Sequence, residues 1–141
     1  SWGAGYGQAD AGSQAASAAE GTRESDDEHM TGFINYSMGG ITVGYQESRI
    51  EKAATGGVDQ DVQAWGIAFA VNDDLSVSYG EREVTYNNPS AAAVTEDGEG
   101  IAVAYTMGSM KIAGNQNEVS NNGGVSGTND SMTEIAVSFA F

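Results

Sequence analysis

Three consecutive acidic residues, Asp26, Asp27 and Glu28, are the densest group of side chains in the sequence that could do chemistry. Ca²⁺ is a hard cation that takes several carboxylate and carbonyl oxygens at once, so this group is a candidate calcium site in an acidic loop. The residue spacing of an EF-hand loop is absent around it, and an acidic loop in contact with solvent accounts for the same residues. We therefore expect no cofactor, with Ca²⁺ as the one alternative.

Side chains suited to catalysis are scarce in this sequence. The chain has 1 His, His29, and no Cys, which excludes a histidine triad, a thiolate metal site and a disulfide framework. No glycine-rich phosphate loop precedes a helical pattern, and no spacing singles out an acid–base pair of carboxylates. A formal net charge of −15 argues against nucleic acid as a partner. We expect that the protein is not an enzyme.

The end of the chain shows the kind of element that must position the remaining polar residues. Between 132 and 141, Ile135, Val137, Phe139 and Phe141 alternate with small or polar residues. A period of two predicts a β-strand with two different faces. The same alternation predicts about eight antiparallel strands, at 1–8, 30–38, 40–49, 62–71, 74–86, 100–107, 109–117 and 131–141.

The connections between these strands alternate in length. Those after the second, fourth and sixth strands are short, whereas the segments 9–29, 49–61, 87–99 and 117–131 are long and polar. Transmembrane barrels are built in this way, with short periplasmic turns and long external loops. The pattern predicts an all-β fold, an antiparallel up-and-down transmembrane β-barrel. A soluble up-and-down sheet or barrel is the alternative.

Most aromatic side chains fall on the apolar face of the predicted strands. Aromatic residues form girdles where a barrel meets the two membrane surfaces, because an amphipathic ring suits the boundary between lipid and water. We therefore predict that these aromatic residues face lipid: Tyr36, Tyr45, Trp65, Phe69, Tyr79, Tyr105, Phe139 and Phe141.

The opposite face of the predicted strands is small or polar, and it holds the charged residues that could act on a solute. We predict that a water-filled lumen, where charges stay hydrated and bias ion passage by their field, is lined by Gln46, Arg82, Lys111, Asn115 and Glu134. A closed eight-stranded barrel needs side chains to fill its interior, and the Ala, Gly and Ser of this face are too small to do so. A wider pore with more strands is the favoured interpretation.

Three stretches resemble general porins of Gram-negative bacteria, of the alphaproteobacterial, Rhodobacter-like kind. They are YSMGGITVGY at 36–45, YTMGSMKIAG at 105–114 and IAVSFAF at 135–141, the last of which ends on an aromatic residue like the closing strand of outer-membrane barrels. The resemblance covers most predicted strands and none of the loops. It implies the C-terminal half of a barrel of about sixteen strands, with the loop that constricts the family's pore in the other half.

The resemblance also implies a location and a function. It implies a homotrimer in the cell outer membrane, in contact with outer-membrane lipid and lipopolysaccharide, which passes small hydrophilic solutes and ions by passive diffusion. Two alternatives remain open. One is a small eight-stranded outer-membrane barrel with a structural or adhesive role. The other is a non-membrane β assembly such as a fibre, in which alternating segments also pair.

Acidic residues dominate the predicted external loops. A pore mouth lined by one sign of charge raises the local concentration of cations, so we predict a weakly cation-selective pore whose preference arises in its vestibule. The loop residues that carry this prediction include Glu51, Asp61, Glu96, Asp97, Glu99, Glu118 and Asp130.

Overall fold

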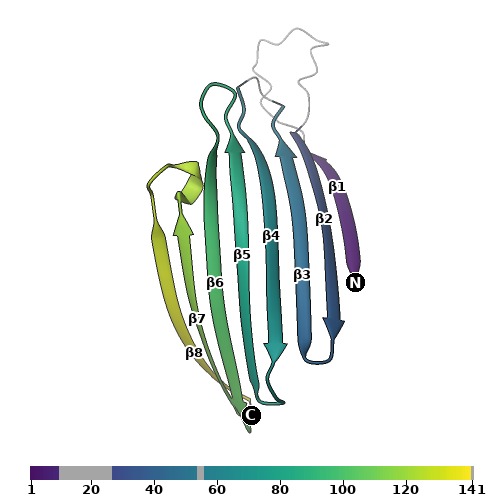
Figure 1. The fold of residues 1–141 in the computed structure, drawn as a ribbon, viewed down its shortest axis with the longest axis vertical. Helices are drawn as coiled ribbons and strands as arrows, with labels where there is room; N and C mark the ends of the chain where they lie inside the picture. The colour runs from purple at the N-terminus through teal and green to yellow at the C-terminus, as the bar shows by residue number, and fades with distance from the viewer. Residues whose placement is uncertain (10–26, 54–55, 141) are drawn as a thin grey trace.

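The protein folds as a single antiparallel β-sheet of eight strands in sequence order (Figure 1). The structure is a computed structural model and describes residues 1–9, 27–53 and 56–140. The strands are β1 (Trp2–Ala9), β2 (Asp27–Met38), β3 (Ile41–Glu51), β4 (Asp59–Ala70), β5 (Leu75–Asn87), β6 (Val94–Met107), β7 (Met110–Ser120) and β8 (Asp130–Phe139). A short 3₁₀ turn, η1 (Asn122–Gly124), lies between β7 and β8. The predicted all-β fold of eight antiparallel strands is confirmed.

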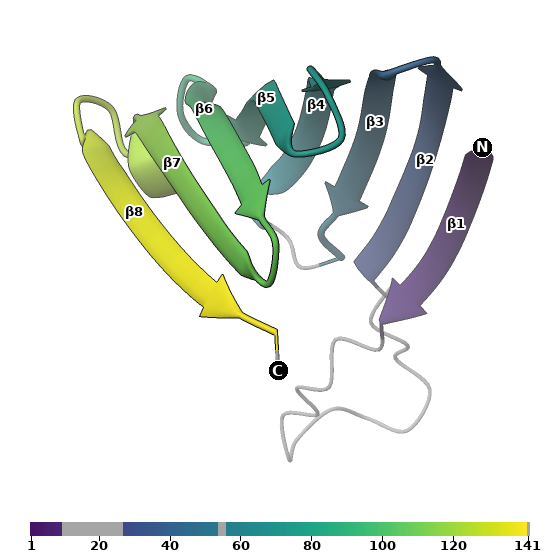
Figure 2. The same cartoon turned by 90° about the horizontal axis from the view of Figure 1, so that it is seen from below.

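The sheet is curved but open. Figure 2 shows it bent into a trough whose two edges are β1 and β8. Every other strand is paired on both sides, and in the described part of the chain no ladder joins β1 to β8. No helix in the described ranges has both the length and the apolar character needed to cross a membrane. Closure into a transmembrane barrel therefore stays a prediction.

Local sequence explains the short turns that join β2 to β3, β4 to β5 and β6 to β7. Gly39 and Gly108 each have a φ of 59°, a left-handed conformation that glycine adopts without steric cost. At the middle turn, the side-chain oxygen of Asn72 accepts hydrogen bonds from the backbone N–H groups of Asp74 and Leu75, both at 2.9 Å. Side chains of Asn commonly close turns in this way.

The register between strands keeps each face continuous. Ile67 of β4 lies directly opposite Val43 of β3 and Tyr79 of β5, and Tyr79 in turn lies opposite Ile101 of β6. Because side chains alternate along a strand, one face of the sheet collects most of the large apolar residues and the other collects the small ones, with Phe33 of β2 as an exception on the second face. We call the second the small-residue face.

The described part of the chain has almost no interior. Among the described residues, Val84 is the only hydrophobic side chain that is buried, and Glu96 is the only buried polar or charged one. A sheet needs a second layer on its apolar face to be stable in water. This sheet therefore requires a covering that lies outside the described structure.

Several strands extend further toward the loop end than the sequence predicts. The segment 87–99 was expected to be a loop, but β6 begins at Val94 and pairs with β5 along its length. The alternation is hidden there because both faces carry carboxylates or glycine, as in Glu96, Asp97 and Gly98. The same correction applies to β2, β3, β4, β7 and β8, which contain Asp27, Glu28, Glu51, Asp59, Asp61, Glu118 and Asp130.

Candidate functional site

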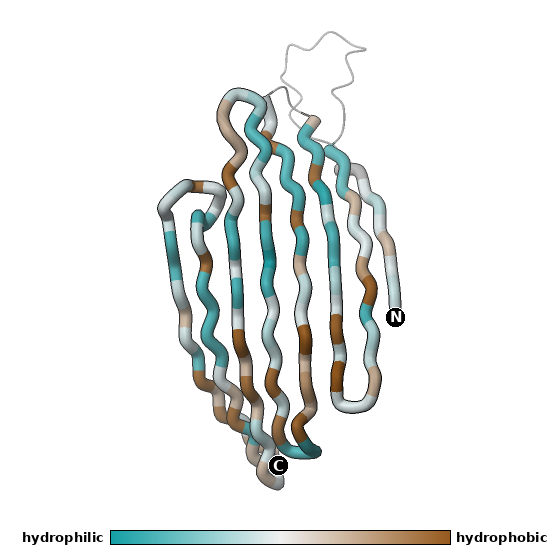
Figure 3. Tube along the Cα trace, viewed as in Figure 1, coloured by the Kyte–Doolittle hydropathy of each residue, from teal (hydrophilic) through white to brown (hydrophobic). Residues whose placement is uncertain are grey.

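Hydrophobic residues gather in the half of the strands near the short turns (Figure 3). The register between strands places most of them on one face of the sheet, where they form an apolar band. Its side chains are well exposed, with Trp2 at 82%, Tyr36 at 64% and Ile135 at 78%. We define the apolar band by residues from all eight strands: Trp2, Ile34, Tyr36, Met38, Ile41, Val43, Tyr45, Trp65, Ile67, Phe69, Leu75, Val77, Tyr79, Ile101, Val103, Tyr105, Met107, Met110, Ile112, Ile135, Val137 and Phe139.

The aromatic residues predicted to face lipid belong to this band. Tyr36, Tyr45, Trp65, Phe69, Tyr79, Tyr105 and Phe139 all share its face, whereas Phe141 lies outside the described residues. Their common face follows from the register. Whether that face contacts lipid stays a prediction.

Two of these aromatic side chains mark the edge of the apolar band. Trp65 and Tyr79 pack edge to face, with ring centroids 5.7 Å apart and an interplanar angle of 62°. The Trp65 Nε1–H donates to Glu81 at 3.1 Å. The Tyr79 hydroxyl lies 2.6 Å from Glu81 and 2.9 Å from Glu99, so both carboxylates share its proton. Each ring thus has its apolar body on the band and its polar tip on an acidic neighbour.

Beyond these rings the same face becomes acidic. We define the acidic band by residues of β3, β5, β6 and β7: Glu47, Glu81, Glu83, Asp97, Glu99 and Glu118. Like charges oppose one another in it, because Glu99 lies directly across from both Glu81 and Glu118. Such pairs are destabilising. Most of this band lines a hollow of about 760 Å³.

The acidic band corrects the predicted location of several carboxylates. Asp97, Glu99 and Glu118 were expected in external loops, where they would line a pore mouth. They lie instead on strands, on the face of the apolar band. Their charge therefore acts on the side of the sheet opposite the small-residue face.

The small-residue face carries a row of glycines across its middle. Gly44, Gly66, Gly80 and Gly100 lie directly opposite one another in β3, β4, β5 and β6. A Cβ added at Gly80 would lie 3.1 Å from the carbonyl oxygen of Trp65, so this stretch of backbone fits closely without side chains. At the two ends of the row the side chains of Asn35 and Asn117 occupy the space where a Cβ on Gly44 or Gly100 would lie.

The five predicted pore-lining residues lie on this small-residue face in separate places. Gln46 and Arg82 flank Ala64 in one row across the sheet. Asn115 donates to Glu134 at 3.3 Å, while Lys111 lies opposite Ser138 near the turn end. Arg82 forms an ion pair with Glu96. Their role in lining a pore stays a prediction.

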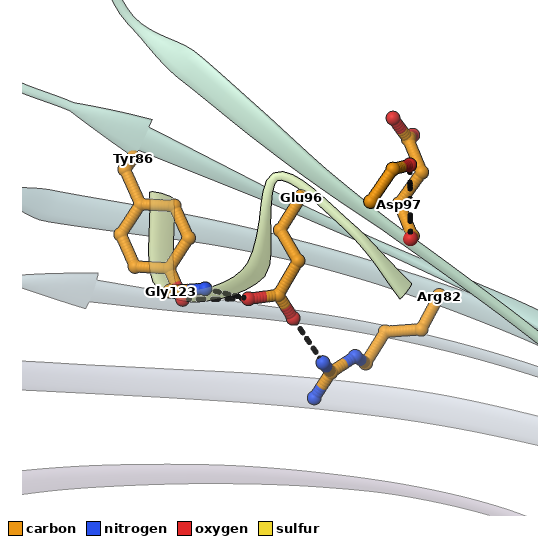
Figure 4. Close-up of polar contacts among 6 residues, drawn as sticks. Arg82, Tyr86, Glu96, Asp97 and Gly123 are labelled. Carbon is orange, nitrogen blue, oxygen red and sulfur yellow. Dashed lines mark hydrogen bonds and ion pairs between the residues drawn. The ribbon is translucent and has the colours of Figure 1, made fainter. Parts of the chain in front are cut away.

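Glu96 is the centre of a polar cluster that the alternation of residues along the strands does not reveal (Figure 4). Its side chain is 5% exposed, and its carboxylate accepts hydrogen bonds from the Arg82 guanidinium, from the Tyr86 hydroxyl at 3.3 Å and from the Gly123 backbone N–H at 2.7 Å. These donors come from β5 and from η1. Burial, together with the negative charge of Glu96, raises the pKa of the Tyr86 phenol.

The loop between β7 and β8 is fixed in shape around this cluster. Asn121 is left-handed, with a φ of 53°, and its side chain donates to the Thr95 carbonyl oxygen at 2.8 Å and accepts from the Gly127 N–H at 2.9 Å. Gly124, with a φ of 73°, lies so close to Tyr86 that an added Cβ would be 2.7 Å from its ring. The loop therefore lies on the small-residue face of β5 and β6.

A separate contact at the loop end involves Asp27, which was predicted as a calcium ligand. Its carboxylate accepts from the Lys52 ammonium at 2.7 Å and from the Ala53 backbone N–H at 2.9 Å. The hydrogen bond from Lys52, then that from Ala53, lowers the pKa of Asp27 below its ordinary value. Asp26 lies outside the described residues, and within them no group of three acidic or histidine side chains could hold a metal ion. The Ca²⁺ site stays a prediction.

Comparison of the chain with protein-family models, curated proteins and solved structures gives no match. The function therefore has to be inferred from the two faces of the sheet and the cluster at Glu96.

Proposed function

We propose that the chain forms part of an outer-membrane β-barrel, with the apolar band in the hydrocarbon of the bilayer and the small-residue face toward a water-filled pore. The observation that carries the proposal is the apolar band itself, which is exposed and extends over all eight strands. Soluble monomers rarely expose a contiguous apolar patch of more than a few hundred Å². Lipid is a covering that needs no second protein layer.

The boundary between the two bands supports this placement. Trp65 and Tyr79 lie between apolar residues on one side and the carboxylates of Glu81 and Glu99 on the other. Such amphipathic rings are enriched where lipid meets water. The acidic band then lies at the level of the outer surface, and the short turns lie at the periplasmic end, as the porin resemblance implies.

The open edges support a barrel wider than eight strands. In lipid, the unpaired N–H and C=O groups along β1 and β8 would each be costly, so both edges must be paired. Closing the sheet on itself would leave the glycine row facing an interior that small side chains do not fill. Additional strands solve both problems, in keeping with a porin-like homotrimer that passes small hydrophilic solutes and ions.

The proposal is tested by adding the detergent-purified protein to a planar lipid bilayer. We expect stepwise increases in conductance, and a gel mobility that changes when the sample is boiled, because barrels resist detergent until heated. The matched control is an equal amount of detergent from a mock purification. A protein that stays in aqueous solution without detergent, or that forms fibres and never gives conductance steps, would contradict the proposal.

A further inference from the structure

We propose that Glu96 is a positioning residue that holds the β7–β8 loop over the small-residue face, and that this loop narrows the pore. The inference rests on the proposed pore function and adds to it a specific constriction. It derives from the position of the loop, from the burial of Glu96 and from the exposure of Arg82.

The position of the loop is not required by connectivity. β7 and β8 are neighbours in the sheet, so a short hairpin turn could join them. The chain instead turns back across β6 as far as β5, where Gly123 bonds to Glu96 and Gly124 lies against Tyr86. Val84, directly opposite Glu96 in the ladder, is buried at this place. The loop thus covers part of the face that we assign to the pore.

The Glu96 carboxylate links the middle of the loop, at Gly123, to the sheet. A buried carboxylate is costly unless charged or polar donors compensate it, and Glu96 receives one donor from the loop and two from β5. Loss of that carboxylate leaves the Gly123 N–H without its acceptor. The Asn121 side chain also joins the loop to β6 through the Thr95 carbonyl oxygen, whereas its bond from the Gly127 N–H lies within the loop. Neither bond supplies an acceptor for the Gly123 N–H.

The same pairing fixes a cation at the narrow place. The Arg82 side chain is 52% exposed, so its guanidinium contacts water while bonded to Glu96. A solute that passes this part of the face would meet the guanidinium and the loop side by side, because both are bonded to Glu96. The site therefore limits size mainly, because the opposite charges of Arg82 and Glu96 largely cancel.

The test compares Glu96→Ala with wild-type protein in lipid bilayers by two measurements. We expect hydrogen exchange at the Gly123 amide to become about tenfold to a hundredfold faster, because a charge-assisted hydrogen bond has been removed. We also expect single-channel conductance to rise. The matched control is Glu83→Ala, which removes an equal charge from the neighbouring strand β5, on the opposite face of the sheet. It should leave both quantities as in the wild type.

A second pair of variants tests the same inference in case Glu96→Ala does not fold. Gly124 and Gly127 both have positive φ values, 73° and 81°, so an alanine is strained at either place. Only at Gly124 would the added Cβ meet the Tyr86 ring, whereas nothing lies within 4 Å at Gly127. We expect Gly124→Ala to raise conductance and Gly127→Ala to leave it close to wild type.

The outcomes separate this inference from the proposed function. Wild-type protein that forms no channels overturns the pore itself, and the constriction with it. Wild-type channels whose conductance is unchanged in Glu96→Ala, although Gly123 exchanges faster, overturn the constriction alone. Unchanged exchange at Gly123 shows that Glu96 does not hold the loop, and it overturns the positioning role.

Discussion

At the scale of single residues, two carboxylates at the loop end of the sheet hold neighbouring connections in place through hydrogen bonds. Asp27 holds the start of the β3–β4 connection by accepting from Lys52 at 2.7 Å and from the Ala53 N–H at 2.9 Å. Glu96 does the same for the β7–β8 loop. Both contacts join a strand to a connection that follows a different strand. They order polar segments that have few apolar contacts to hold them.

We predict that the ionised Asp27 carboxylate keeps its hydrogen bonds from Lys52 and Ala53 until the pH falls below the ordinary pKa of an aspartate. Because Lys52 and the Ala53 N–H lower the pKa of Asp27 below 3.8, the stabilisation is fully present above that value. It is lost as the pH falls through the lower pKa of the folded state. The measurement is an NMR titration of the Asp27 carboxyl carbon. A midpoint at or above the ordinary value would contradict the prediction.

The control for this titration is Lys52→Gln, which removes the largest cause of the shift. The Asp27 pKa should move back toward 3.8 in the variant, although not fully, because the Ala53 N–H still donates. At neutral pH the carboxylate stays ionised in both proteins. Any difference in the β3–β4 connection at that pH therefore reports the lost ion pair and not a change in the charge of Asp27.

The sequence could place some of these residues but could not pair them. Arg82, Glu134 and Gln46 lie on the predicted face because alternation along a strand determines it. Glu96 was assigned to a loop, and its pairing with Arg82 depends on the register between β5 and β6. A buried Glu can be suspected from Arg82, a charge among small residues that needs a partner. The return of the β7–β8 loop across β6 has no comparable signal in the sequence.

At the scale of elements, the apolar band decides where strands can be recognised. Periodicity predicts the turn half of each strand, because large apolar residues alternate there with small ones. It fails in the loop half, where the acidic band replaces the apolar one and Val94 to Glu99 read as a loop. The backbone ladder between β5 and β6 nevertheless continues through the acidic residues. The strand boundaries at the loop end were therefore the least predictable part of the fold.

Lysine substitutions on adjacent residues of β4 test which face meets lipid. Ile67 lies in the apolar band between Val43 and Tyr79, while Ala68 lies on the small-residue face between Thr42 and Ser78. We expect Ile67→Lys to lower the free energy of unfolding in bilayers by about 2–4 kcal/mol, since a charge is placed in hydrocarbon. Ala68→Lys should cost far less, because its ammonium remains in water.

The measurement for this pair is urea unfolding from lipid vesicles, followed by tryptophan fluorescence. A larger loss in Ala68→Lys than in Ile67→Lys would reverse the assignment of the two faces. Equal and small losses would indicate that neither face contacts lipid. The second result would instead favour an assembly in water, such as the fibre considered from the sequence.

At the scale of the whole molecule, the charged side chains of the described strands are unevenly divided between the two faces of the sheet. The acidic band lies on the face of the apolar band, away from the proposed pore. On the small-residue face the strands carry basic groups at Arg82 and Lys111, and Arg82 is paired with Glu96. Glu134 bonds to Asn115 on the same face. The pore wall is therefore much closer to neutral than the chain as a whole.

This division sharpens the prediction of weak cation selectivity. The carboxylates of the acidic band lie on the face of the sheet that points away from the proposed pore. Only carboxylates on the small-residue face, or in the connections at the loop end, can therefore bias the passage of ions through the pore. Their effect depends on screening, and the Debye length falls from about 10 Å at 0.1 M salt to about 3 Å at 1 M. We expect a modest cation preference at low salt that nearly vanishes at molar salt, measured as the reversal potential across a planar bilayer.

Glu134→Gln should shift that potential toward anions, whereas Glu83→Gln, which removes an equal charge from the opposite face, should not. Equal shifts in both variants, or a cation preference unchanged at molar salt, would show that the selectivity does not come from the small-residue face.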